Sequence, residues 1–333
     1  MATKGTKGTK HHSTKRPLNG RADHQLTHAD AIRHRAALLD WFATDYLIHA
    51  FVAGLPSHGA RLWPDQWSHA SFEDRVALYR NEGMVPASRW REAAVVYADP
   101  AMCDLVTAAA QTFPEQPVQR HEFLAPTGFL FFAKPIPATA LAFPGSTDEL
   151  PISAITWACV DDGLSSIAYT LRSAGVYDVG GVRIPFPALH PSRPYDLLWD
   201  SPAERGMHNV SMLRALSALS KQPLAREDSP KIHQSVRGIA RRSGIHPKQF
   251  RRISLRRPEI ASFELAAARA VAEGCTPAGH WVRGHWREQY YATVDEHRPI
   301  WVEGFPRGDF TKSAPTGQKL LIAHGDRPTA AAT

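Results

Sequence analysis

ISAITWACVDDGLSSIAYTL, residues 152–171, carries the strongest structural signal in this sequence. Two runs rich in apolar residues, 152–160 and 164–171, flank the tripeptide Asp161-Asp162-Gly163. Runs of this length and composition predict strands, and a short Asp- and Gly-rich connection is typical of a tight turn. The stretch therefore predicts a β-hairpin at the centre of an antiparallel sheet.

The residues on either side of this hairpin extend the prediction to a central domain over residues 116–225. Residues 128–132 predict a further strand, and residues 177–187 predict another pair of strands across Gly180 and Gly181. Residues 207–219 return to the spacing of an amphipathic helix, which would cover the sheet. His190, Asp196 and Asp200 fall in what reads as a Pro-rich loop, and their pattern gives no reason to assign them a role.

Residues 27–115 predict a mainly helical region. Thr27 and Asp30 have the spacing of a capping box at the start of a first helix. Ser71 would cap a second helix over residues 72–82. A third helix would begin after Asp99, with Pro100 in its first turn.

The composition favours a globular intracellular protein. The 333 residues suit about two domains of roughly 100–200 residues each, and 43% are apolar without a run long enough to cross a bilayer. The first residues lack the apolar segment of a secretory signal, so we expect a cytoplasmic protein that does not contact membranes.

No cofactor or metal site is predicted. Cys103, Cys159 and Cys275 lie far apart and without zinc-finger spacing, which favours buried free thiols. His280 and His285 are five residues apart, so they do not share a helix face as zinc-binding pairs do. The phosphate-binding, dinucleotide-binding and serine-hydrolase glycine motifs are also missing from the sequence.

The sequence predicts disorder at both ends of the chain, over residues 1–26 and 326–333. Residues 1–26 contain six lysines and arginines, one acid and few apolar side chains, so they cannot bury enough surface to fold. Two interpretations of this tail remain open. It is either a solubilising segment or an arm that lies along nucleic acid.

The clearest electrostatic feature lies in residues 226–258. Between residues 231 and 257 there are nine cations and no acid: Lys231, Arg237, Arg241, Arg242, Lys248, Arg251, Arg252, Arg256 and Arg257. So many like charges favour a polyanion as partner. The segment reads either as a basic linker or as a helix-turn-helix with Ala240 and Gly244 at the contact and turn, but residues from Phe250 onward also fit a strand.

HWVRGHWREQYY, residues 280–291, predicts a strand in a β-rich carboxy-terminal module over residues 259–325. A strand would place Arg283, His285 and Arg287 on one face. Such a face can hold a phosphate diester, and His285 between two guanidinium groups could move a proton during its cleavage. Catalysis would need a second proton-transfer group, for which His297, Glu303 and His324 are candidates. The alternative is a solvated sheet face without chemistry.

The same carboxy-terminal residues, with HRPIWVEGFPRGD at 297–309, resemble those of uncharacterised proteins from actinobacteria and their phages or mobile elements. SLRRPE at 254–259, PTGFLFFAKPI at 126–136 and AITW at 154–157 resemble upstream blocks of that group. The group has no established activity. The resemblance implies a bacterial intracellular setting in which DNA or RNA is the usual partner.

The sequence therefore predicts an α+β protein with a helical amino-terminal region, a central antiparallel sheet with a covering helix and a small basic β-rich carboxy-terminal module. The predicted function is nucleic-acid binding through phosphate contacts by Arg241, Arg242, Lys248, Arg251, Arg252, Arg256, Arg257, Arg283 and Arg287. The alternative is a metal-independent, ribonuclease-like or phosphoryl-handling toxin centred on His285, with Arg283 and Arg287 holding the phosphate. The oligomeric state is not predicted.

Overall fold

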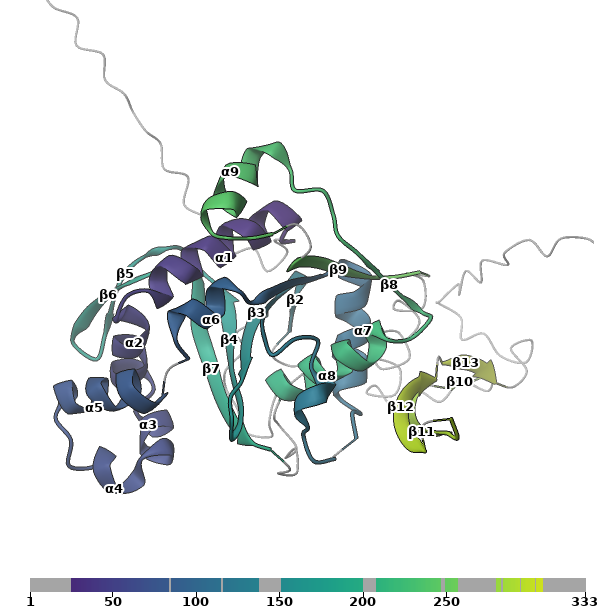
Figure 1. Cartoon of the computed structure of the whole chain (residues 1–333), viewed down its shortest axis with the longest axis horizontal. Coiled ribbons are helices and arrows are strands. Elements are labelled where there is room, and N and C mark those ends of the chain that lie inside the picture. The colour runs from purple at the N-terminus through teal and green to yellow at the C-terminus, as the bar shows by residue number, and fades with distance from the viewer. Residues whose placement is uncertain are drawn as a thin grey trace, which may run out of the picture.

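A seven-stranded mixed sheet forms the centre of the molecule, in the order β7-β4-β3-β2-β1-β9-β8 (Figure 1). The computed structural model describes residues 25–83, 85–114, 116–137, 151–199, 208–246, 249–256, 280–282, 284–293, 295–302 and 304–307. The strands of the sheet are β1 (Ala94–Ala98), β2 (Thr127–Ile136), β3 (Ile152–Cys159), β4 (Gly163–Leu171), β7 (Leu189–Leu198), β8 (Ala225–Asp228) and β9 (Phe250–Leu255). The predicted α+β class is confirmed.

The predicted central hairpin is confirmed as β3 and β4, which pair antiparallel from Cys159 opposite Leu164 to Ala154 opposite Tyr169. Strand β2 joins the other side of β3, also antiparallel. Gly163 is required where the hairpin meets β7, because a Cβ atom there would lie 2.0 Å from the carbonyl oxygen of Leu197. The turn sequence thus permits both the reversal and the close approach of the next strand.

The sheet is mixed rather than antiparallel, because β1 pairs parallel with both β2 and β9. Strand β1 lies within residues 27–115, which the sequence analysis predicted as helical. Its five residues, AVVYA, are too few to show a period, and they are surrounded by helical segments. Helix α7 (Pro100–Ala110) follows at once and connects β1 to β2 as a crossover.

Helices cover the sheet on both faces, which explains why β2 and β3 are buried along almost their whole length. Helices α7 and α8 (His208–Ser220) pack together on one face and contact β2, β9 and β4 (Figure 1). On the other face, Phe42 of α1 (His28–Phe42) and Trp90 of α6 (Ala87–Arg91) pack their rings on Phe129 of β2. The core therefore consists of three layers.

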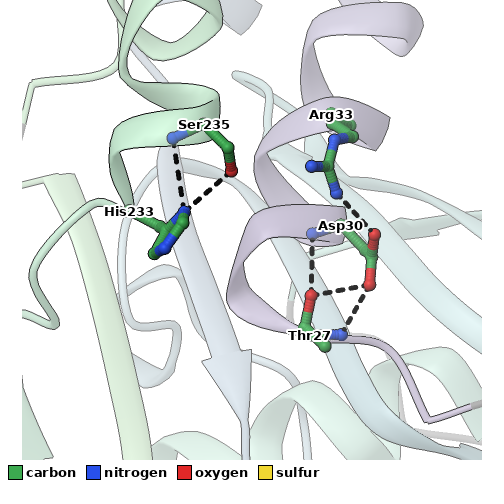
Figure 2. A network of polar contacts seen from close by, with 5 residues as sticks. All are labelled: Thr27, Asp30, Arg33, His233 and Ser235. Carbon is green, nitrogen blue, oxygen red and sulfur yellow. Dashed lines mark hydrogen bonds and ion pairs between the residues drawn. The ribbon is translucent and has the colours of Figure 1, made fainter.

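Local capping signals place the helices of the amino-terminal region correctly. At the start of α1, Asp30 N–H donates to the Thr27 hydroxyl, and Thr27 N–H donates to the Asp30 carboxylate, as Figure 2 shows. Ser71 and Asp74 form the same capping box at α5 (Phe72–Leu78), which continues into the π-helical turn η1 (Tyr79–Gly83). Asp99 caps α7. The other helices here are α2 (Tyr46–Gly54), α3 (Pro56–Leu62) and α4 (Pro64–Trp67).

The second predicted hairpin is also confirmed, as β5 (Gly175–Val179) and β6 (Val182–Phe186). Its turn residues Gly180 and Gly181 have φ angles of 58° and 85°, a region that favours glycine. The predicted Pro-rich loop that follows is wrong for residues 189–198, because they form the edge strand β7. An edge strand tolerates prolines, since one row of its backbone groups needs no ladder partner.

The segment 226–258 is part of the sheet rather than a linker or a helix-turn-helix. Its described residues supply β8, helix α9 (Gln234–Arg242) and β9. The predicted second helix of the motif is wrong, because residues 250–255 form the strand that pairs with β1 and β8. The strand alternative succeeds because Phe250, Ile253 and Leu255 are buried between its neighbours. The predicted domain boundaries at 115/116 and 225/226 thus fall inside one folded unit.

The carboxy-terminal module is β-rich in its described residues, as predicted, but residues 280–291 do not form one strand. Strand β10 (His280–Val282) pairs with β13 (Phe305–Arg307), whereas β11 (His285–Tyr291) pairs with β12 (Glu296–Val302). Trp286 of β11 attaches this hairpin to the body: its indole N–H donates to the carbonyl of Ala109 in α7, 3.0 Å away. The prediction of a continuous strand is therefore wrong at Gly284.

Several expectations fall outside the described residues. These are residues 1–24 and 326–333, residues 259–279 and 308–325 of the predicted carboxy-terminal module, and Cys275. The predicted disorder is wrong at Leu26, which is buried and whose N–H donates to the carbonyl of Ala133. Cys103 and Cys159 are buried free thiols, as predicted.

Within the part of the chain that is described, no single helix is long and apolar enough to cross a membrane. Helices α1 and α2 pass that test of length and composition only as a pair, which is bent by 82°.

Candidate nucleic-acid interface and ligand cleft

Helix α9 presents a concentrated basic face that is exposed in the described part of the chain. Val236 and Ala240 bury one side of the helix, while Arg237, Arg241 and Arg242 are exposed on the other. No carboxylate of the described residues forms an ion pair with any of these three guanidinium groups. Arg241 and Arg242 also lie in the last turn, where cations favour the helix dipole. This stabilisation of the helix accounts for the presence of Arg241 and Arg242 but not for that of Arg237.

Helix α9 is fixed firmly to the body of the molecule. It packs beside α1, and Arg35 of α1 donates to the carbonyl oxygen of Ser243, 2.7 Å away, at the end of α9. Gly244 then turns the chain with a φ of 69°, and Ile245 is buried. The basic face is therefore displayed on a rigid support.

The amino-terminal ends of α1 and α9 lie side by side, as Figure 2 shows. The Nδ1 atom of His233 caps α9 by accepting from Ser235 N–H, 3.3 Å away. Because the chain enters α1 through residues 25–27, the basic residues 1–24 are attached to the body next to α9.

Arg251 and Arg252, two of the predicted phosphate contacts, are neutralised by carboxylates of the neighbouring strand. Both Nε and Nη2 of Arg251 donate to Glu227, at 2.5 and 2.6 Å. Arg252 Nη2 lies 2.5 Å from Asp228, and this hydrogen bond raises the pKa of Arg252. These ion pairs occupy both guanidinium groups, so phosphate contacts by Arg251 and Arg252 stay a prediction that would require the pairs to open. Linear spacing missed the pairing because the acids precede the acid-free segment and reach it only through the β8–β9 ladder.

The remaining predicted contacts are divided between two places. Arg256 is exposed and donates through Nε to the carbonyl of Ala225, 3.2 Å away. Arg287 is exposed on β11 and donates to Gln289. Figure 1 shows α9 and the β11–β12 hairpin at well-separated parts of the molecule, so their cations do not form one patch. Lys248, Arg257 and Arg283 lie outside the described residues.

His285 lies on an exposed strand face, and the described residues place no second proton-transfer group beside it. His285 and Arg287 share this face, as predicted, and the residues opposite them on β12 are Val302 and Ile300. His297 pairs with Tyr290 and therefore belongs to the other face of the hairpin. Glu303 and His324 lie outside the described residues. The described residues thus provide no acid–base pair at His285.

A cleft of about 870 Å³ lies between α8, η2 (Arg120–Glu122) and strand β12. Its polar lining comprises Gln116, Gln119, His121, Glu122, Arg214, Lys221, Gln222, Tyr291, Glu296, His297 and Arg298. Neither His285 nor Arg287 lines it. Sequence reasoning missed this site because its walls come from segments far apart in the chain.

A second polar cluster that the sequence did not indicate joins α3, η1 and β7. The two ring nitrogens of His58 lie 2.7 Å from the Tyr79 hydroxyl and 2.6 Å from the Asp196 carboxylate. Burial, with a smaller contribution from Asp196, raises the pKa of Tyr79. The adjoining cavity is only about 20 Å³, which leaves no room for a substrate. We assign this cluster to the stability of the fold.

Among the described residues no group of three or more His, Cys, Asp or Glu side chains is arranged to hold a metal ion.

Comparison with known proteins adds no assignment. No family model matches the sequence, and no curated protein matches it. Among solved structures, the chain is similar to one titled "Crystal structure of AcrVA2", with 12% identity and a TM-score of 0.33 over 85% of this chain and 95% of that chain. A TM-score this low supports no argument about fold or function.

Proposed function

We propose that this protein binds nucleic acid and that its contact surface is the exposed face of α9. The observation that carries the proposal is the group formed by Arg237, Arg241 and Arg242, which face solvent without a described carboxylate partner. Exposed guanidinium groups on a rigid helix suit phosphate oxygens, which they can contact without reorganisation of the protein.

Two further features support this proposal. Lys231 and His233 are exposed just before the helix, and the six cations of residues 1–24 are joined to the chain beside it. The resemblance of the carboxy-terminal residues to the uncharacterised actinobacterial and phage group favours a cytoplasmic, mobile-element setting, in which nucleic acid is the usual partner.

The test is a salt titration of binding to labelled duplex DNA, single-stranded DNA and RNA, followed by fluorescence anisotropy. The variant Arg241→Gln/Arg242→Gln removes two cations from α9. The control Arg80→Gln/Arg183→Gln removes two exposed cations from η1 and β6. Each lost phosphate contact reduces the slope of log affinity against log salt by about 0.7 for a single strand and about 0.9 for duplex DNA.

We expect the α9 variant to bind more weakly and with a slope reduced by about one to two units, and the control to keep the slope of the unmodified protein. Absence of binding at low salt would overturn the proposal. So would equal losses in the two variants, because net charge alone would then account for the affinity.

A further inference from the structure

We propose that the cleft between α8 and β12 binds a nucleotide unit through its phosphate and its base. This site is separate from the exposed face of α9 and does not depend on the function proposed for that face. The cleft has a volume of about 870 Å³, which is in the range of sites for small organic ligands.

One wall is formed by α8 and the turn that follows it. Arg214 and Ala218 lie on α8, Lys221 and Gln222 lie just after its last residue, Ser220, and all four line the cleft. Arg214 is only 2% exposed, and it is held by a 2.8 Å ion pair with Glu122, a hydrogen bond to the carbonyl of Gln116 and the ring of Phe113. Its position is therefore fixed before any ligand arrives.

Two donors in this wall lack an acceptor within the described part of the protein. The Nε atom of Arg214 and the Nε2 atom of Gln222 are both buried without a hydrogen-bond partner there. A buried N–H group without an acceptor costs roughly 1–3 kcal/mol. Gln222 is half-buried and lines the cleft, so its amide can turn and donate to a ligand oxygen, which would remove its share of that cost and favours an anion.

The charges around the cleft favour the same class of ligand. Glu122 is balanced by Arg214, and Glu296 is balanced by Arg298 at 2.7 Å. Lys221 is exposed and has no ion-pair partner among the described residues. The uncompensated charge of the described lining residues is therefore positive.

The opposite wall provides an aromatic surface. Tyr291 is 39% exposed, and the Arg298 guanidinium lies 5.9 Å from the centre of its ring. Exposed tyrosine and arginine planes are typical surfaces for stacking a base. A phosphate on the α8 wall and a base on Tyr291 together describe a nucleotide, either free or as one unit of a single strand.

The experiment is calorimetric titration of the full chain with AMP, UMP, inorganic phosphate and a short single-stranded oligonucleotide. Lys221→Gln and Tyr291→Ala each remove one proposed contact. Arg183→Gln, on β6, is the control for loss of one exposed cation, and Tyr46→Ala is the control for an exposed tyrosine, since Tyr46 is 38% exposed. These changes are at the surface, so they test binding in a folded protein.

We expect each cleft variant to raise the Kd for the mononucleotide or the oligonucleotide at least tenfold, and each control to leave it unchanged. Binding of the mononucleotide would identify a free nucleotide as the ligand. If the cleft variants raise the Kd for the oligonucleotide alone, the ligand is one unit of a single strand. Absence of binding by all of these ligands would overturn the proposal. An affinity for inorganic phosphate equal to that for AMP, unaffected by Tyr291→Ala, would overturn the nucleotide assignment.

Discussion

Arg35 illustrates at the residue scale how this fold uses a buried cation without a carboxylate. Its guanidinium is completely buried and donates to the carbonyl oxygens of Arg91 and Ser243, at 2.8 and 2.7 Å. Burial lowers the pKa of Arg35 to about 10, so the side chain remains charged at neutral pH. Because these carbonyls end α6 and α9, the charge meets the negative ends of two helix dipoles.

Substitution of this residue has a large predicted cost. Arg35→Met should lower the free energy of unfolding by about 3 kcal/mol, because it removes the donor from the partly buried carbonyls of Arg91 and Ser243. Urea unfolding measures the change. Arg33→Met is the control, since Arg33 is 47% exposed and its surface pair with Asp30 should be worth less than about 1 kcal/mol. Equal effects of the two changes would contradict the role given to Arg35.

The ion pairs of β9 lead to a second prediction at this scale. Arg251→Gln should change nucleic-acid affinity much less than Arg241→Gln, although both remove one positive charge. The Arg251 guanidinium is occupied by Glu227, whereas Arg241 is exposed. Anisotropy at a fixed salt concentration compares them directly. A larger loss for Arg251→Gln would mean that the pair opens to contact the ligand.

At the element scale, α9 contains a glycine in its exposed middle, which is unfavourable for a helix. A Cβ atom at Gly238 would meet only Nη1 of Arg242, at an ordinary distance of 3.6 Å. Gly238→Ala should therefore raise the free energy of unfolding by about 0.5–1 kcal/mol. Thermal and urea unfolding test this expectation. A loss of stability would show that α9 is distorted or more tightly covered than the structure indicates.

The same substitution also bears on binding. If a phosphate backbone lies close to the helix surface, the added methyl group should weaken nucleic-acid binding while the protein becomes more stable. Opposite changes in stability and affinity are not expected from a merely structural glycine.

The elements that sequence reasoning placed correctly are those with local signals. The capping pairs at Thr27 and Ser71 and the turns at Gly163 and Gly180 are each recognisable within a few residues. Strand β1 was missed because it is short, and its burial comes from β2 and β9 on either side. The choice between helix and strand for residues 250–255 also depended on a distant partner, β1.

The candidate sites also divide into features that the local sequence indicates and features that depend on distant partners in the fold. Arg241 and Arg242 follow from the density of cations along the chain, but the exposed helix face that they share with Arg237 follows only from the burial of Val236 and Ala240 in the fold. The pairing of Arg251 and Arg252 requires the β8–β9 register, and the wall of Arg214 and Lys221 requires the packing of α8 against β12. The number of cations in a sequence segment therefore overestimates how many of them lack a carboxylate partner in the folded protein.

On the scale of the whole molecule, the buried histidines predict how stability depends on pH. Burial lowers the pKa of His28, His34 and His190, and Arg252 adds a smaller lowering contribution at His28. The folded protein thus disfavours their protonation, whereas the unfolded chain takes up protons near pH 6.5. The contribution of these histidines to stability is fully present above that pH and is lost as the pH falls from there through their lowered pKa values in the folded protein.

We expect the free energy of unfolding to decrease between pH 7.5 and pH 5.5. His28→Phe, which keeps an aromatic ring against Tyr97, should reduce this dependence, whereas His246→Phe at an exposed position should not. Urea unfolding at several pH values gives the comparison. A pH profile that is flat in the unmodified protein would contradict the assignment.

The position of β1 between β2 and β9 has a consequence for biosynthesis. Because Val95 pairs with Phe250, the middle of the sheet cannot close until residues far along the chain have left the ribosome. Until then one edge of β1 offers unpaired backbone groups to other chains. Such long-range pairing also slows folding, so this protein should depend on chaperones during synthesis more than a helical protein of similar size.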